Sequence, residues 1–128
     1  MEFDDLYALA RDVIQPRDLS QHASAGYVGA AILAASGRVY TGVCIDMACS
    51  IGFCAEHAAA AAMVTAGESK VLKVIAVGED GRVMPPCGRC REFLRQLNDE
   101  NGESEVQVSV DRVVRLKDLL PHDWRRDG

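Results

Sequence analysis

Three cysteines and one glutamate stand at a spacing that suits metal chemistry. Cys54 is followed two residues later by Glu56, and Cys87 and Cys90 form a Cys-x-x-Cys pair further along the chain. Both stretches open segments with a helical apolar pattern. Three thiolates beside a carboxylate that is not a ligand leave a fourth position free. This is the layout of a catalytic zinc site rather than of a closed structural one.

The expected local structure favours this chemistry. Cys54 and Cys87 each stand where a helix begins, and the unpaired N–H groups there favour a thiolate. A zinc ion lowers the pKa of water to about 7, and Glu56 would take that proton and deliver it to the substrate. Three thiolates around a doubly charged cation leave one net negative charge. Arg89, inside the Cys pair, is the first candidate to offset it, and His57 is the second.

Other interpretations of the same residues stay open. A Cys-x-x-Cys pair alone also fits a redox motif or half of a structural zinc site, to which Cys44, Cys49 or His57 would add a ligand. A redox motif would need neither Glu56 nor Cys54. Taken singly, Cys44 and Cys49 fit small buried hydrophobic residues, and His57 fits a packing residue.

Composition limits the class of protein and of partner. The 128 residues, 48% of them hydrophobic, suit a single domain over residues 1–128 with a substantial core. The formal net charge is -5, and a nucleic-acid groove would need a basic surface. We therefore expect a small-molecule partner and no nucleic acid.

The chain also shows no sign of a membrane or an export route. No apolar run approaches the roughly 20 residues of a membrane span. Residues 1–5 are acidic without an apolar stretch, so we expect no signal peptide. An odd number of cysteines, five, favours reduced thiols in the cytoplasm.

The remaining elements must position the four chemical residues. Apolar periodicity and turn residues predict helices over 3–14, 54–66 and 88–98, a loop over 17–26, a hairpin of 27–34 with 38–44, an irregular link over 45–53, strands over 71–77, 106–110 and 113–114, and a helical turn over 116–120. Alternating helices and strands predict a layered α/β domain with a mixed sheet. The alanine-rich helix over 54–66 is apolar on nearly every side, which predicts burial. Trp124, in the tail, is expected to pack.

The chain resembles the cytidine deaminase family, including its blasticidin S deaminase branch. The residues that carry the likeness are Val28–Ala31, Cys54–Glu56 and Pro86–Arg91, within a region from about Tyr27 to Arg91. The resemblance implies a three-layer α/β/α sandwich around a five-stranded mixed sheet. It implies one zinc ion per subunit on Cys54, Cys87 and Cys90, with Glu56 as proton shuttle. It also implies a homotetramer whose sites are completed by neighbouring subunits.

The same resemblance bears on the substrate. It implies contacts to the base from the Ala55 N–H and the Pro85 carbonyl. The family's ribose-binding Asn and Glu align with Cys44 and Asp46. Asp46 can still accept a hydrogen bond from a hydroxyl, whereas Cys44 cannot replace an amide. Arg89 matches the arginine that the blasticidin S branch carries inside its Cys pair.

The metal pattern predicts a zinc-dependent hydrolase, and the resemblance implies that it deaminates a cytosine-type nucleoside or analogue to the uracil-type product and ammonia. Cytidine, deoxycytidine or a modified cytidine are the expected substrates, with a blasticidin S-type antibiotic as the alternative. A hypothesis of another class is a non-catalytic, zinc-stabilised nucleoside-binding module. A closed set of four ligands would favour that module, and an open fourth position would count against it.

Overall fold

The structure is a computed structural model that describes residues 1–125, so the last three residues of the predicted domain lie outside the described part. The helices are α1 (Phe3–Asp12), α2 (Ala55–Thr65), α3 (Gly88–Leu97) and α4 (Leu116–Leu119), with short 3₁₀ turns at Ala48–Ser50 and Asp99–Glu103. The strands are β1 (Arg17–Ser20), β2 (Ala23–Ala34), β3 (Val39–Met47), β4 (Val71–Gly78), β5 (Val83–Met84), β6 (Glu105–Ser109) and β7 (Arg112–Arg115).

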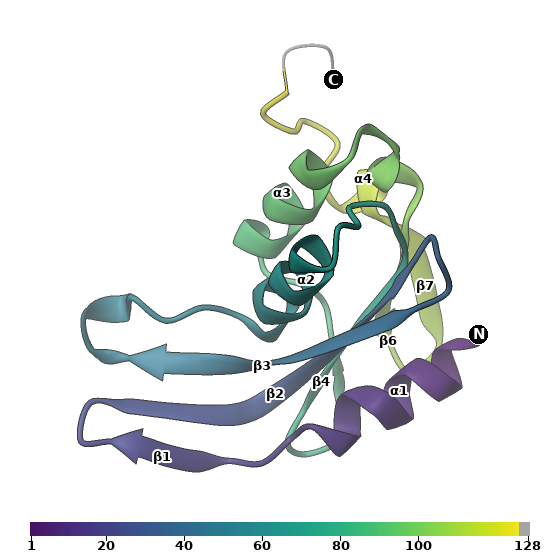
Figure 1. Cartoon of the computed structure of the whole chain (residues 1–128). Helices are drawn as coiled ribbons and strands as arrows, with labels where there is room; N and C mark the ends of the chain where they lie inside the picture. The colour runs from purple at the N-terminus through teal and green to yellow at the C-terminus, as the bar shows by residue number, and fades with distance from the viewer. Residues whose placement is uncertain (126–128) are drawn as a thin grey trace.

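A single mixed sheet forms the middle layer. Its longer strands run in the order β3-β2-β4-β6-β7, and only the β4–β6 pairing is parallel. Helix α1 covers one face, while α2 and α3 cover the other (Figure 1). The predicted α/β/α class and mixed sheet are therefore confirmed. The strand count was wrong, because β1 and β5 add two short antiparallel pairings, to the start of β2 and the end of β4, and make seven strands.

Strands β2 and β4 carry the core on both of their faces. Side chains alternate across a strand, so Ala30 and Ile32 pack under α2 and α3, whereas Ala31 and Leu33 pack under α1. Leu6 of α1 is fully buried in the same cluster as Ala31 and Leu33. Burial on both faces explains why β2 and β4 read as continuous apolar runs rather than as alternating patterns.

Helix α2 lies unusually close to the sheet because small residues line the contact. A Cβ added at Gly42 of β3 would lie 2.4 Å from the Ala59 backbone nitrogen. The helix is not buried on nearly every side as predicted, since Ala61, Ala62 and Val64 are exposed. The prediction failed because a helix on one face of a sheet turns its outer side away from that sheet.

The segment that precedes α2 was only partly predicted. The expected loop over 17–26 contains β1 and the start of β2, whose polar residues sit at the sheet edge and so lack an apolar pattern. In the expected irregular link over 45–53, β3 continues to Met47 and Ile45 pairs with Phe53. This pairing holds the chain next to β3 just before Cys54.

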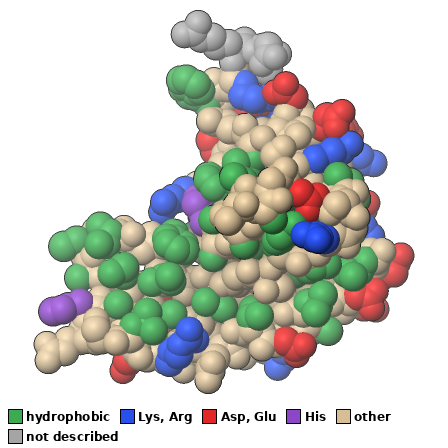
Figure 2. Space-filling view, viewed as in Figure 1, with side chains coloured by type: hydrophobic (Ala, Val, Ile, Leu, Met, Phe, Trp, Pro, Cys, Tyr) green, Lys and Arg blue, Asp and Glu red, His purple; other side chains and the backbone are tan. Residues whose placement is uncertain are grey.

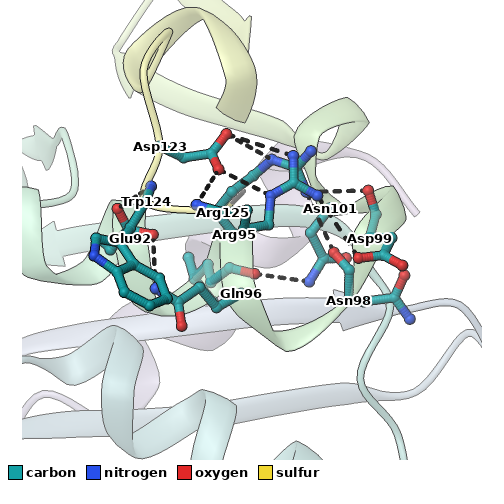
Figure 3. A network of polar contacts seen from close by, with 10 residues as sticks. Glu92, Arg95, Gln96, Asn98, Asp99, Asn101, Asp123, Trp124 and Arg125 are labelled. Atoms are coloured by element: carbon teal, nitrogen blue, oxygen red, sulfur yellow. Dashed lines mark hydrogen bonds and ion pairs between the residues drawn. The ribbon is translucent and has the colours of Figure 1, made fainter. Parts of the chain in front are cut away.

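The tail after α4 is fastened to α3 by polar contacts. Asp123 lies 4.0 Å from Arg95 Nε and 2.9 Å from Arg125 Nε, and the Trp124 N–H donates to Glu92 Oε1 at 3.0 Å (Figure 3). The Trp124 side chain is 75% exposed, so the expectation that it packs within the chain was wrong. Only its backbone is held against α3.

Candidate metal centre and active site

Three thiols from two helix starts meet at one point. Cys54 and Cys87 are the N-cap residues of α2 and α3, and Cys90 lies in the first turn of α3. The sulfur of Cys87 lies 3.4 Å from that of Cys54 and 3.5 Å from that of Cys90, and all three lie within 4.8 Å of one another. Tetrahedral zinc with Zn–S bonds of about 2.3 Å separates its sulfurs by about 3.8 Å. The three thiols therefore fit a zinc ion.

The three thiols differ in their environments. Burial and a hydrogen bond with Cys87 raise the pKa of Cys54 to about 11. For Cys87, burial is outweighed by hydrogen bonds from the backbone N–H groups of Cys90 and Arg89 and from neighbouring thiols, so its pKa is lowered. Burial and the negative charge of Glu56 raise the pKa of Cys90. The expected helix-start effect thus appears at Cys87 and not at Cys54. A coordinated cation deprotonates all three outright.

Glu56 lies beside the thiols without joining them. It stands in the first turn of α2, is only 4% exposed, and has a pKa raised by burial. The group of Cys, His, Asp and Glu side chains able to share an ion comprises Cys54, Cys87 and Cys90 among residues 1–125. An ion held by these three thiols would keep one position free of ligands from the described residues, and the buried Glu56 carboxyl lies close to the group.

A cavity of about 550 Å³ opens onto this group. The four residues predicted to contact substrate, Cys44, Asp46, Ala55 and Pro85, all line it together with Glu56 and Arg89. Cys44 is buried, and its sulfur lies 3.9 Å from Asp46 Oδ2. The structure thus gathers every predicted substrate-binding residue around one cavity.

Two further lining residues, Phe53 and Met84, were not predicted from the sequence. Phe53 reaches it through its strand-like pairing with Ile45, and Met84 through the two-residue strand β5. Pairings this short leave no periodic pattern, although Phe53 could have been noticed because it directly precedes Cys54.

The two candidates for offsetting thiolate charge occupy different positions. Arg89 is exposed, lines the cavity, and donates to the Gly52 carbonyl at 3.3 Å. His57 Nδ1 lies 3.3 Å from the Cys90 sulfur. Burial, reinforced by the positive charge of Arg89, lowers the pKa of His57. His57 packs as predicted, and it also touches a candidate ligand.

Comparisons with known proteins agree with this site. The family model for the cytidine and deoxycytidylate deaminase zinc-binding region matches residues 5–102. A cytidine deaminase of Mycobacterium tuberculosis is 40% identical over 102 residues, covering 78% of this chain and 74% of the relative. One from Halalkalibacterium halodurans is 33% identical over 123 residues, covering 91% and 92%. The crystal structure of the M. tuberculosis protein superposes with a TM-score of 0.82 at 30% identity, covering 98% of each chain.

The metal group can be tested by removing one thiol. We expect Cys87→Ser to lose bound zinc and about 3 kcal/mol or more of unfolding free energy, because ligand binding stabilises only the folded state. Serine is a good N-cap, so the start of α3 should survive. Zinc content by mass spectrometry and urea unfolding measure both effects.

The matched control is Cys49→Ser, since Cys49 is exposed and lies outside the group of three. It should keep its zinc and its stability. Full zinc occupancy in Cys87→Ser would contradict the assignment of Cys87 as a ligand.

Proposed function

Because the chain belongs to the cytidine and deoxycytidylate deaminase family, we propose that it hydrolyses the exocyclic amine of a cytosine-type nucleoside to give the uracil-type product and ammonia. The observation that carries this proposal is the meeting of Cys54, Cys87 and Cys90 beside buried Glu56 at the floor of a cavity. It is an enzyme that uses one zinc ion per chain.

The three thiols and Glu56 have different roles in the proposed reaction. Zinc held by the three thiolates supplies Lewis-acid activation of water at neutral pH. Glu56 acts as general base and then as general acid: it takes a proton from the attacking water and passes it to the substrate as ammonia leaves. Burial supports this role, because its raised pKa makes the carboxyl easier to protonate during turnover.

Two backbone groups hold the base in this proposal. Ala55 is the first residue of α2, where the N–H has no partner within the helix. Pro85 lies two residues before Cys87, the N-cap of α3, and lines the same cavity. An N–H on one side and a carbonyl on the other can pair with the acceptor and donor edge of a cytosine ring.

In this proposal Asp46 is the main contact of the sugar and Cys44 is a weaker one. Asp46 offers a carboxylate acceptor to a sugar hydroxyl, while the neighbouring thiol of Cys44 is only a weak hydrogen-bonding group. We therefore place the sugar of the substrate against Asp46. The cavity accepts nucleosides whose sugar presents a single well-recognised hydroxyl, and deoxycytidine and modified cytidines belong to this class.

Arg89 is the cation of the site. Its guanidinium lines the cavity, and its charge reaches His57, which itself touches Cys90. It can therefore offset part of the negative charge that three thiolates leave on a divalent ion. Its hydrogen bond to the Gly52 carbonyl also fixes the chain that leads into Cys54.

We propose a homotetramer in which neighbouring chains cover the cavity. Figure 2 shows hydrophobic side chains gathered over the end of the sheet where β1, β2 and β3 extend. Met47, Ile51 and Phe53, near the cavity, are 43%, 68% and 37% exposed, and Val64 on α2 is 47% exposed. Exposed apolar residues around the cavity mark an interaction surface, and we propose that Val64 contacts a neighbouring chain as well.

A cytoplasmic location is proposed from the cysteines. All five are free thiols, and a reducing compartment keeps thiols from forming disulfides. In the described part of the chain, no helix has the length and apolar character of a membrane span. Fractionation of the source cells tests the location, and recovery outside the cytoplasm would overturn it.

The proton-transfer role predicts the behaviour of Glu56→Gln. We expect the rate of ammonia release to fall by about 10²–10⁴-fold, because general acid–base catalysis contributes that much, while zinc content stays unchanged. Ammonia release from cytidine measures the rate. Glu79→Gln, in an exposed turn, is the control and should keep full activity. Undiminished turnover in Glu56→Gln would remove the assigned role, and zinc-loaded wild type without any turnover would favour a binding module.

A substrate panel tests the sugar assignment. Asp46→Ala should lower kcat/KM for cytidine and deoxycytidine about tenfold or more, because a charged hydrogen-bond acceptor is lost, and should leave free cytosine unaffected. Cys44→Ala, the neighbouring control, should change all three by much less. An equal loss on nucleoside and free base would show that Asp46 does not contact the sugar. Faster release from blasticidin S than from any nucleoside would favour the antibiotic alternative.

The proposed assembly predicts the mass in solution. Sedimentation equilibrium should give four times the chain mass of 13.9 kDa. Val64→Asp should dissociate the assembly, because it would bury an unpaired charge between chains. Val110→Asp is the control, since Val110 is 86% exposed on the turn that joins β6 to β7. A monomeric wild type would exclude the tetramer.

A further inference from the structure

His57 lies between a candidate metal ligand and an aromatic ring. Its Nδ1 is 3.3 Å from the sulfur of Cys90, which is fully buried. Its ring stacks on Phe93 with a centroid separation of 4.2 Å and an interplanar angle of 18°. Cys90 and Phe93 are three residues apart on α3, so one face of that helix supplies both contacts.

We propose that His57 is a positioning residue of the metal centre, whose Nδ1–H donates a hydrogen bond to the Cys90 thiolate and tunes its donation to the metal. This inference rests on the metal site of the proposed function. A thiolate bound to a cation has no proton and can only accept, so the proton of this contact must reside on Nδ1.

Phe93 fixes the plane of the His57 ring. A histidine ring can rotate about its side-chain bonds and can present either nitrogen, and near-parallel stacking restricts the ring to one plane. In that plane Nδ1 faces Cys90. The pair thus joins the start of α2 to the second turn of α3 and fixes the relative position of two elements that both carry ligands.

The contact acts on the most enclosed of the three sulfurs. Cys54 and Cys87 are partly accessible, whereas Cys90 is fully buried and lies close to the Glu56 charge. A buried anion without a hydrogen-bond donor costs more than an exposed one. Arg89 does not replace this donor, because its guanidinium reaches the Gly52 carbonyl at 3.3 Å.

Three variants separate the hydrogen bond from the stacking. His57→Phe keeps a flat ring against Phe93 and removes the donor. We expect its zinc affinity, measured by competition with a chromophoric chelator, to fall about 10–100-fold, as is usual when the partner of a metal ligand is lost. His57→Asn places an amide N–H near the position of Nδ1 and should recover much of that loss. His22→Phe removes an exposed histidine as a control and should bind zinc like the wild type.

Cobalt substitution gives a readout that a purely structural role would not move. A hydrogen bond lowers the energy of sulfur lone pairs, so its loss in His57→Phe should shift the sulfur-to-cobalt charge-transfer band to longer wavelength. His57→Asn should shift it back. An unchanged band together with unchanged zinc affinity in His57→Phe would overturn the proposal.

The wild-type enzyme provides an independent test if His57→Phe fails to fold. In the zinc-loaded protein, ¹⁵N-resolved NMR of the His57 ring should show a proton on Nδ1. A proton on Nε2 alone would refute the hydrogen bond even with full deaminase activity. Conversely, the expected tautomer in a protein that releases no ammonia would leave the metal-centre proposal standing and remove the proposed function.

Discussion

The site depends on two helices that begin at the same place. Cys54 opens α2 and Cys87 opens α3, and their sulfurs come within 3.4 Å. Such closeness is unfavourable for thiolates alone, because like charges in a partly buried site repel strongly. Burial is the main cause of the raised pKa values of Cys54 and Cys90, and the neighbouring thiols add to it. A divalent cation removes the repulsion, so metal binding and the local geometry stabilise each other.

The sheet is what brings the two helix starts together. Strand β3 and the Ile45–Phe53 pairing deliver the chain to Cys54, while β4 and β5 deliver it to Cys87. Gly42 and the alanines of α2 then let the helix approach closely enough to bury Glu56. The same close packing that raises the pKa of the carboxyl therefore also sets its distance from the thiols. A larger residue at Gly42 would push α2 away from the sheet. This shift would change the packing of the helix and the position of Glu56 together.

Local patterns together with the family resemblance predicted the candidate centre and the fold class. Spacing and the resemblance singled out Cys54, Cys87 and Cys90, which lie at or near the start of a helix that apolar periodicity identifies. Sequence patterns failed where a strand pairing is short. They also failed where the structure depends on the direction in which a side chain points. β1 and β5 have too few residues for a periodic signal, and the outer face of α2 is as apolar as its inner face. No sequence rule could tell that His57 turns toward Cys90, or that Trp124 turns outward while its backbone N–H binds Glu92.

The distribution of charge around the cavity fits a neutral substrate. Asp46 and Glu56 are the carboxyl groups of its lining, and Arg89 is the cation. Glu56 is buried with a raised pKa, and the Arg89 guanidinium is engaged with the Gly52 carbonyl. An overall charge of -5 would repel polyanions from the surface. A nucleoside, uncharged and able to donate a hydroxyl hydrogen bond to Asp46, meets these conditions better than a nucleotide or a nucleic-acid strand.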